Sequence, residues 1–231
     1  SLAGTMTTPE QPQSIGPYEI LETLGSGGMG TVYLGRHTET KQEVAVKVLS
    51  PSMAQEEGLV ERFRREVGAL EKLTNVHIVQ IYESGESQGT YYYAMEYVPG
   101  ETLTERLRRE RQLGWEEVIE VSVQVCVALK AAHDAGIIHR DLKPSNILYT
   151  NDAADRTWLV SDFGLAVRTG NLESTVDDSG VVGTPAYMSP EQAKDPKAVD
   201  ERSDIYSFGA TFYHAWTGRP PFEPSDYYLP A

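Results

Sequence analysis

The spacing of hydrophobic residues divides the chain into two parts. Short runs rich in β-branched and aromatic residues, separated by turn residues, predict five strands at 18–25, 31–37, 43–49, 79–85 and 90–97. One intervening segment, 59–73, has apolar residues three and four positions apart, which predicts an amphipathic helix. The first part of the chain is therefore expected to be a small sheet that carries one helix.

Helical periodicity dominates the rest of the chain. Residues 115–133 give the clearest long helix, and short strands and loops are expected over 137–167. Pro99 and Gly100 stand where the pattern changes and are expected to end a hinge between two lobes. The fold class that follows is α+β, in three regions: a flexible leader over 1–16, part of it a cloning remnant, a small antiparallel-sheet lobe over 17–97, and a mainly helical lobe over 98–231.

Composition narrows the possible partners. With 20 Lys and Arg against 34 Asp and Glu, the net charge is −14, so the surface should repel nucleic acid and anionic lipid. The most apolar stretch, 118–129, is shorter than the ~20 residues of a bilayer span, so no membrane contact is expected. Cys126 is the single cysteine, which favours a reducing, cytoplasmic compartment. Its apolar neighbours predict that it is buried.

A glycine-rich segment carries the first candidate chemistry. Gly25-Ser26-Gly27-Gly28-Met29-Gly30 has the spacing G-x-G-x-x-G, which alone is a weak signal. A P-loop would need Lys after the last glycine, and a dinucleotide-binding loop would open a helix there. The chain instead continues with Thr31 and Val32, which favour a strand. We expect a hairpin whose backbone N–H groups lie over phosphates, with a merely flexible hairpin as the alternative.

Two charged residues occupy otherwise apolar faces. In the strand 43–49, Lys47 points the same way as Ala45 and Leu49, so its ammonium needs an anionic partner. In the helix 59–73, Glu66 lies in an apolar stripe at spacings of four and three. We predict that Glu66 pairs with Lys47 and aims it at nucleotide phosphates. The alternative is that both side chains extend separately to solvent.

The segment His139-Arg140-Asp141-Leu142-Lys143-Pro144-Ser145-Asn146 brings a carboxylate and, five residues later, an amide oxygen into one loop. Such a loop can orient an attacking hydroxyl and hold a hard cation. It matches the pattern H-R-D-L-x-x-x-N of protein kinases, which this chain resembles. Asp162-Phe163-Gly164, the ending 183–191 and the helix that begins near Asp204 match further kinase elements in the same order. The resemblance covers about 18–222 and is strongest to bacterial Hanks-type serine/threonine kinases.

The resemblance implies a fold, cofactors and roles. The fold would be the bilobal kinase fold, with ATP between the lobes and Mg²⁺ held by Asn146 and Asp162. Asp141 would be the catalytic base or hydroxyl-positioning group, with Lys143 on the transferred phosphate and Thr184 as support. Met95 would be the gatekeeper, and Glu96 and Val98 would bind adenine through their backbone. The remaining implied contacts are Leu24, Val32, Ala45 and Leu148 on the purine, and a stacked spine of Leu70, Ile81, His139 and Phe163.

The chain departs from the family pattern at its end. It stops at Ala231 and lacks the family's last helices, so the family partner of Glu191 is missing and a buried, unpaired carboxylate is expected there. Apolar surface on the helix of Phe208, Phe212 and Trp216 would also lose its cover, which predicts instability or self-association.

Regulation stays open between alternatives. Arg140 could clamp an activation-loop phosphate, with acceptors among Thr169, Ser174, Thr175 and Ser179, or Asp177 or Asp178 could supply the charge. The two aspartates could also be solvated loop residues without a regulatory role. The expected function is transfer of the ATP γ-phosphoryl group to a Ser or Thr hydroxyl of a protein in a signalling role. A catalytically silent ATP-binding or scaffold module is the alternative. A cytoplasmic domain of a membrane-anchored receptor kinase is compatible with either.

Overall fold

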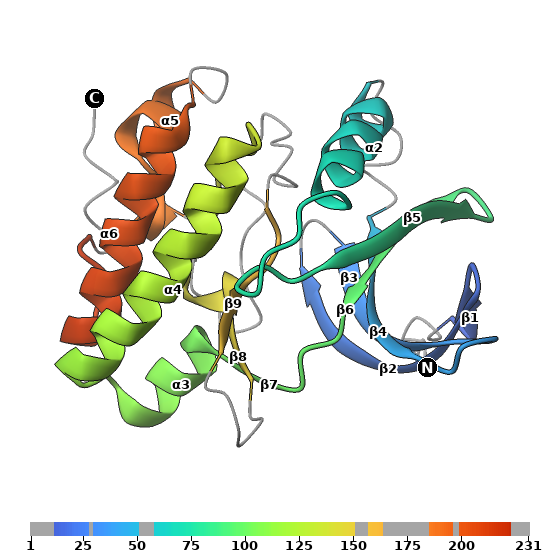
Figure 1. Ribbon diagram of the computed structural model, residues 1–231, viewed down its shortest axis with the longest axis horizontal. Coiled ribbons are helices and arrows are strands. Elements are labelled where there is room, and N and C mark those ends of the chain that lie inside the picture. Colours follow the sequence, from blue (N-terminus) through green and yellow to red (C-terminus); the bar gives the residue numbers. More distant parts are fainter. Residues whose placement is uncertain are drawn as a thin grey trace, which may run out of the picture.

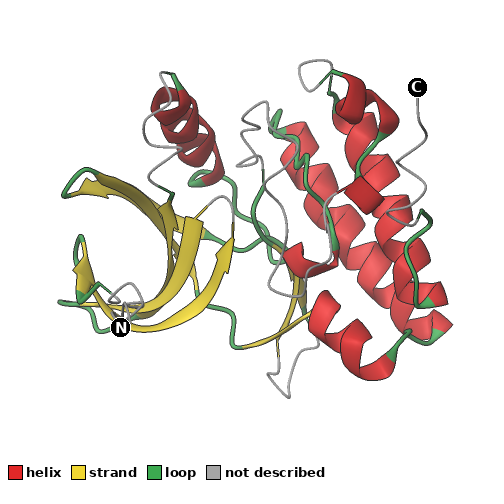
Figure 2. Cartoon of the chain, turned by 180° about the vertical axis from the view of Figure 1, so that it is seen from behind, coloured by secondary structure: helices red, strands yellow, loops and turns green. Residues whose placement is uncertain are grey.

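The computed structural model describes residues 12–27, 30–50, 58–150, 157–163, 185–195 and 199–222. A curled sheet with a single helix beside it makes up one side of the molecule, and helices make up the other (Figures 1 and 2). The two-lobed α+β organisation predicted from the sequence is confirmed. No helix among the described residues has the length and apolar character that crossing a bilayer demands.

The first lobe is built on a six-stranded antiparallel sheet. Its order is β1-β2-β3-β4-β6-β5, with β1 (Ser14–Ile15), β2 (Tyr18–Gly27), β3 (Gly30–His37), β4 (Glu43–Leu49), β5 (Ile81–Ser87) and β6 (Thr90–Glu96). The five predicted strands are all present. The predicted flexible leader extends too far into the chain, because Ser14 and Ile15 pair with β2 and Ile15 is buried.

Both faces of this sheet bury apolar side chains. Along β4, Val44 and Val46 face a small cluster with Tyr18 and Tyr92, whereas Ala45 faces the main core. Helix α2 (Leu59–Leu70) covers this second face and buries Phe63, Val67 and Leu70 against it. The alternation along β4 therefore places Lys47, two residues after Ala45, on the face that α2 covers.

The second lobe begins with elements too short for periodicity to detect. Strand β7 (Gly100–Thr102) pairs with β8 (Ile147–Thr150), which pairs with β9 (Trp158–Val160). Helix α3 (Leu103–Glu110) starts at a capping box in which Thr102 and Glu105 bond each other's backbone N–H groups. The remaining elements are α4 (Trp115–Asp134), the 3₁₀ turns η1 (Pro144–Asn146) and η2 (Pro185–Tyr187), α5 (Pro190–Lys194) and α6 (Glu201–Thr217).

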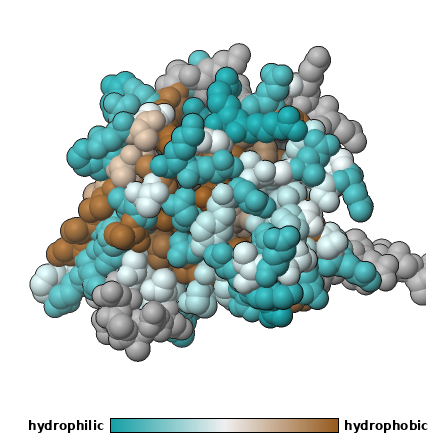
Figure 3. Space-filling view, turned by 45° about the vertical axis from the view of Figure 1, so that its right-hand side comes forward, coloured by the Kyte–Doolittle hydropathy of each residue, from teal (hydrophilic) through white to brown (hydrophobic). Residues whose placement is uncertain are grey.

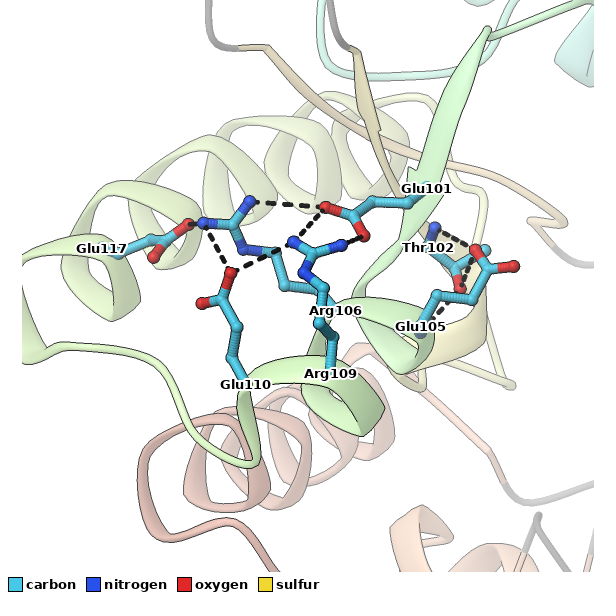
Figure 4. A network of polar contacts seen from close by, with 7 residues as sticks. All are labelled: Glu101, Thr102, Glu105, Arg106, Arg109, Glu110 and Glu117. Atoms are coloured by element: carbon cyan, nitrogen blue, oxygen red, sulfur yellow. Dashed lines mark hydrogen bonds and ion pairs between the residues drawn. The ribbon is translucent and has the colours of Figure 1, made fainter.

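An ion-pair network joins these elements beside the hinge (Figure 4). The Arg106 guanidinium lies 2.8 Å from Glu117 of α4, 3.4 Å from Glu101 of β7 and 3.6 Å from Glu110 of α3. It also lies over the Tyr149 ring at 5.5 Å. The network fixes α3 between β7 and α4, because one partly buried cation serves three carboxylates.

Helices α4 and α6 pack on each other but leave apolar side chains outside. Trp216 on α6 is 61% exposed, while Phe212 is buried and Phe208 is half-buried. Of the side chains predicted to be exposed on this helix, Trp216 is therefore exposed, whereas the prediction is wrong for Phe212. Cys126 is exposed on α4, so its predicted burial is wrong, because it lies on the solvent side of the helix. Hydrophobic side chains gather along one side of the molecule in Figure 3.

Candidate active site

The loop before η1 is held by one buried carboxylate. Asp204 of α6 is fully buried and accepts hydrogen bonds from the backbone N–H groups of His139 and Arg140, both at 2.8 Å. Its Oδ2 also lies 2.7 Å from Nε2 of His133. These contacts agree with the predicted role of the Asp204 helix as anchor of this loop.

Two residues of the site have left-handed backbone geometry without being glycine. Arg140 has φ 65° and Asp162 has φ 59°. Such conformations cost of order 1 kcal/mol and persist only where surrounding contacts impose them. For Arg140 these contacts are the N–H bond to Asp204 and a bond from Gln192 Nε2 to its carbonyl oxygen at 2.6 Å. Tertiary contacts, not local preference, therefore shape the loop.

Three predicted site residues lie together in this loop. The Lys143 ammonium is 2.8 Å from Oδ2 of Asp141. The Asn146 amide donates to the Asp141 carbonyl at 2.8 Å. The Asn146 carbonyl in turn accepts from Ser161 N–H at 2.9 Å, because β8 and β9 pair at Ile147 and Val160. The strand pairing thus brings Asp162 beside the loop that holds Asp141.

Asp162 is the meeting point of the two lobes. Lys47 Nζ donates to its Oδ1 at 2.5 Å, and the Tyr93 hydroxyl donates to the same oxygen at 2.9 Å. Burial acts to raise the pKa of Asp162, but the Lys47 ammonium and the two hydrogen bonds outweigh it and hold that pKa below its usual value. Asp162 is therefore ionised at neutral pH.

The predicted ion pair between Lys47 and Glu66 does not form in this structure. Lys47 pairs with Asp162, and Oε1 of Glu66 accepts from Nη1 of Arg140 at 3.3 Å. The carboxylates of Glu66 and Asp162 both face the side of the sheet that carries Lys47. The sequence could not show which of the two Lys47 would contact. Arg140, the expected clamp for a phosphate, thus contacts α2.

The glycine segment forms a hairpin, as predicted. Gly27 pairs with Gly30 at the tip of β2 and β3, and no helix begins after it. Gly30 has φ 142°, and a Cβ there would lie 1.8 Å from the Val48 carbonyl oxygen, so only glycine fits. At Gly25 and Gly27 a Cβ would have open space. These two glycines keep their side of the hairpin unobstructed.

The residues expected around adenine come from both lobes. Ala45 and Met95 are paired across β4 and β6 and are buried. Val32, Val98 and Leu148 are partly buried against the same core, and Leu24 is 42% exposed. The Glu96 N–H is used within the lobe, where it donates to the Gln80 carbonyl at 2.8 Å. Of the predicted spine, all four residues are buried, and the rings of His139 and Phe163 lie 4.6 Å apart.

The donor chemistry of Asn146 and Asp162 fits magnesium. An amide oxygen and a carboxylate are hard oxygen ligands, and Mg²⁺ is commonly held by one or two carboxylates together with water and phosphate oxygens. No group of three or more His, Cys, Asp or Glu that could hold a metal occurs among the described residues.

The segment 185–195, which follows the site in the sequence, corrects one prediction. Glu191 at the start of α5 is exposed, not buried, and its Oε1 accepts from the Ser203 hydroxyl at 2.9 Å. Ser189 caps this helix by accepting from the Gln192 N–H. Several predicted residues lie outside the described part of the chain, namely Gly28, Met29, Gly164, Thr169, Ser174, Thr175, Asp177, Asp178, Ser179 and Thr184.

Two contributors to the site do not stand out in the sequence. The hydrophobic pattern marks Tyr93 only as part of a strand, and Gln192 lies unremarked in a longer motif. The register of β4 with β6, which places Tyr93 opposite Lys47, could have indicated the first. No sequence signal indicates that Gln192 reaches Arg140.

A glycine-rich hairpin, a lysine on the sheet and two loops that carry aspartates, together on a bilobal fold, are the arrangement typical of the protein kinase class. The family model "Protein kinase domain" matches residues 18–228, and the chain belongs to this family. It is 39% identical over 221 residues to serine/threonine-protein kinase PknB of Mycobacterium leprae, a match that covers 94% of this chain and 35% of that protein. It is 42% identical over 211 residues to a probable PknB of Corynebacterium glutamicum, covering 89% and 32%.

Solved structures give the same result. The crystal structure of the Mycobacterium tuberculosis PknI kinase domain matches with a TM-score of 0.74 and 32% identity, covering 96% of this chain and 80% of that one. The chain spans about a third of the length of the curated relatives. The likeness therefore concerns the kinase domain.

Proposed function

We propose that this chain is the catalytic domain of a serine/threonine protein kinase that transfers the γ-phosphoryl group of ATP to a Ser or Thr hydroxyl of a protein substrate. One observation carries the proposal. A continuous run of contacts leads from Lys47 through Asp162 and Ser161 to Asn146 and Asp141. These are the groups that phosphoryl transfer from a metal–nucleotide complex requires, and both lobes contribute to them.

The roles follow from chemistry and position. Asp141 would accept a hydrogen bond from the substrate hydroxyl and orient it for attack in line with the leaving oxygen. Lys143, 2.8 Å from Asp141, would offset negative charge on the transferred group. Asn146 and Asp162 would hold magnesium, which supplies charge neutralisation at the phosphates when bound. Lys47 would leave Asp162 to bind phosphate oxygens.

The test is transfer of labelled γ-phosphate from Mg-ATP to a generic Ser/Thr protein. Lys47→Met and Asp141→Asn should each lower transfer by at least about 10²-fold. Lys130→Met and Asp134→Asn are matched controls, because these two residues form an exposed i,i+4 ion pair on α4. Both controls should keep full transfer. Transfer that survives in Lys47→Met and Asp141→Asn would contradict the proposal.

A catalytically silent nucleotide-binding module is the second candidate. The observation that favours it is the Glu66–Arg140 ion pair, because Lys47 is then not held by α2. This candidate predicts that ATP raises the melting temperature while no phosphate is transferred under any condition. Transfer at a rate that depends on Asp141 would exclude it.

A further inference from the structure

Two neighbouring strands deliver two hydrogen-bond donors to one carboxylate oxygen. Lys47 of β4 and Tyr93 of β6 are directly opposite each other in the sheet, so their side chains share a face. Both donate to Oδ1 of Asp162, at 2.5 Å and 2.9 Å. Only the lysine belongs to the motifs that the sequence displays.

The Tyr93 ring and the Tyr93 hydroxyl serve different ends. The ring is buried in the core, 2% exposed, with its centroid 6.0 Å from that of Phe63 on α2. A phenylalanine would fill this space equally well. A buried hydroxyl is costly unless it is hydrogen-bonded, and this one is directed at Asp162. Packing therefore accounts for the ring, while the hydroxyl acts on the carboxylate.

We propose that Tyr93 is a positioning residue for the magnesium-binding carboxylate of Asp162, an inference that rests on the proposed kinase function. When Lys47 turns to the phosphates, the Tyr93 hydroxyl still holds Oδ1 and leaves Oδ2 for the metal. A carboxylate fixed in this way loses less rotational freedom when the metal binds. Hydrogen-bond partners of metal ligands typically change metal affinity by about 10–100-fold when they are removed.

The experiment uses binding, not turnover. The dissociation constant of a non-hydrolysable ATP analogue is measured by calorimetry over a series of free Mg²⁺ concentrations, and that of adenosine is measured separately. Tyr93→Phe should raise the half-saturating Mg²⁺ concentration about tenfold and leave adenosine binding unchanged. Tyr91→Phe is the matched control: Tyr91 lies on the same strand and face, and its ring contacts Arg64 instead. It should change neither value.

A double-mutant cycle shows whether Tyr93 acts through Asp162. In an Asp162→Asn background, Tyr93→Phe should have no further effect on the Mg²⁺ dependence. An unchanged or lower half-saturating Mg²⁺ concentration in Tyr93→Phe overturns the inference, and so does a parallel loss of adenosine binding. If the unmodified chain binds neither adenosine nor the analogue, the proposed function fails as well. That result is distinct from failure of the Tyr93 inference alone.

Discussion

Removal of the Asp204 carboxylate tests how the catalytic loop is held. In Asp204→Ala, the buried N–H group of His139 and the partly buried N–H group of Arg140 lose their acceptor. An unsatisfied buried donor costs about 1–3 kcal/mol, so the two together should lower the free energy of unfolding by about 4 kcal/mol. Asp204→Asn keeps one acceptor oxygen and should lose about 2 kcal/mol.

Urea unfolding followed by tryptophan fluorescence measures this loss. With a slope of about 2 kcal/mol per molar urea, Asp204→Ala should lower the midpoint by about 2 M at an unchanged slope. Asp200→Asn is the matched control, because Asp200 is the N-cap of the same helix and asparagine caps equally well. A loss in Asp204→Ala below about 1 kcal/mol, or no larger than that of the control, would refute the reasoning.

Four further outcomes are expected. Arg106→Ala should lower the free energy of unfolding by about 1–3 kcal/mol in urea titrations, because Glu117 loses this cation while Glu101 and Glu110 keep Arg109. A loss below about 0.5 kcal/mol would contradict this. Ser189→Ala should cost about 1 kcal/mol by the same assay, because α5 loses its N-cap. Burial lowers the pKa of His214, so the folded chain binds fewer protons at this residue than the unfolded chain does. The stability that depends on His214 is therefore complete above the unfolded pKa of about 6.5 and declines below it. His214→Gln should flatten the fall in melting temperature between about pH 7 and 5. Trp216→Lys should reduce self-association measured by light scattering, because it replaces an exposed apolar side chain with a charged one. An unsubstituted chain that is already monomeric at high concentration would contradict this prediction.

Periodicity predicted the long elements because burial fixes which side chains point inward. The strands around Val44 and Val46 and the helix around Phe63 follow directly from alternation and from spacings of three and four. Strand β7 and helix α3 were missed because three and eight residues carry too little pattern. The helix start at Thr102 did have a signature, since Glu105 completes a capping box.

The partners of charged residues were harder to predict than their positions. Lys47 and Glu66 were placed on the correct faces, but α2 brings Glu66 to Arg140 while β9 brings Asp162 to Lys47. These distances depend on how two lobes are placed, and no local pattern encodes that placement. Asp204 was predicted correctly because a family motif, rather than a hydrophobic period, marks it.

The left-handed geometry of Arg140 and Asp162 has a consequence for substitution tolerance. Glycine adopts this geometry at no steric cost, so a glycine substitution relieves about 1 kcal/mol of backbone strain at each position. This gain offsets part of the stability that is lost when the ion pair of the native side chain is removed. A screen that selects only for thermal stability should therefore tolerate glycine at Arg140, whose ion pair with Glu66 is partly exposed. The same screen should reject glycine at Asp162, because Lys47 and Tyr93 would lose the carboxylate to which they donate. At Asp162, folding and phosphate transfer would therefore select for the same side chain.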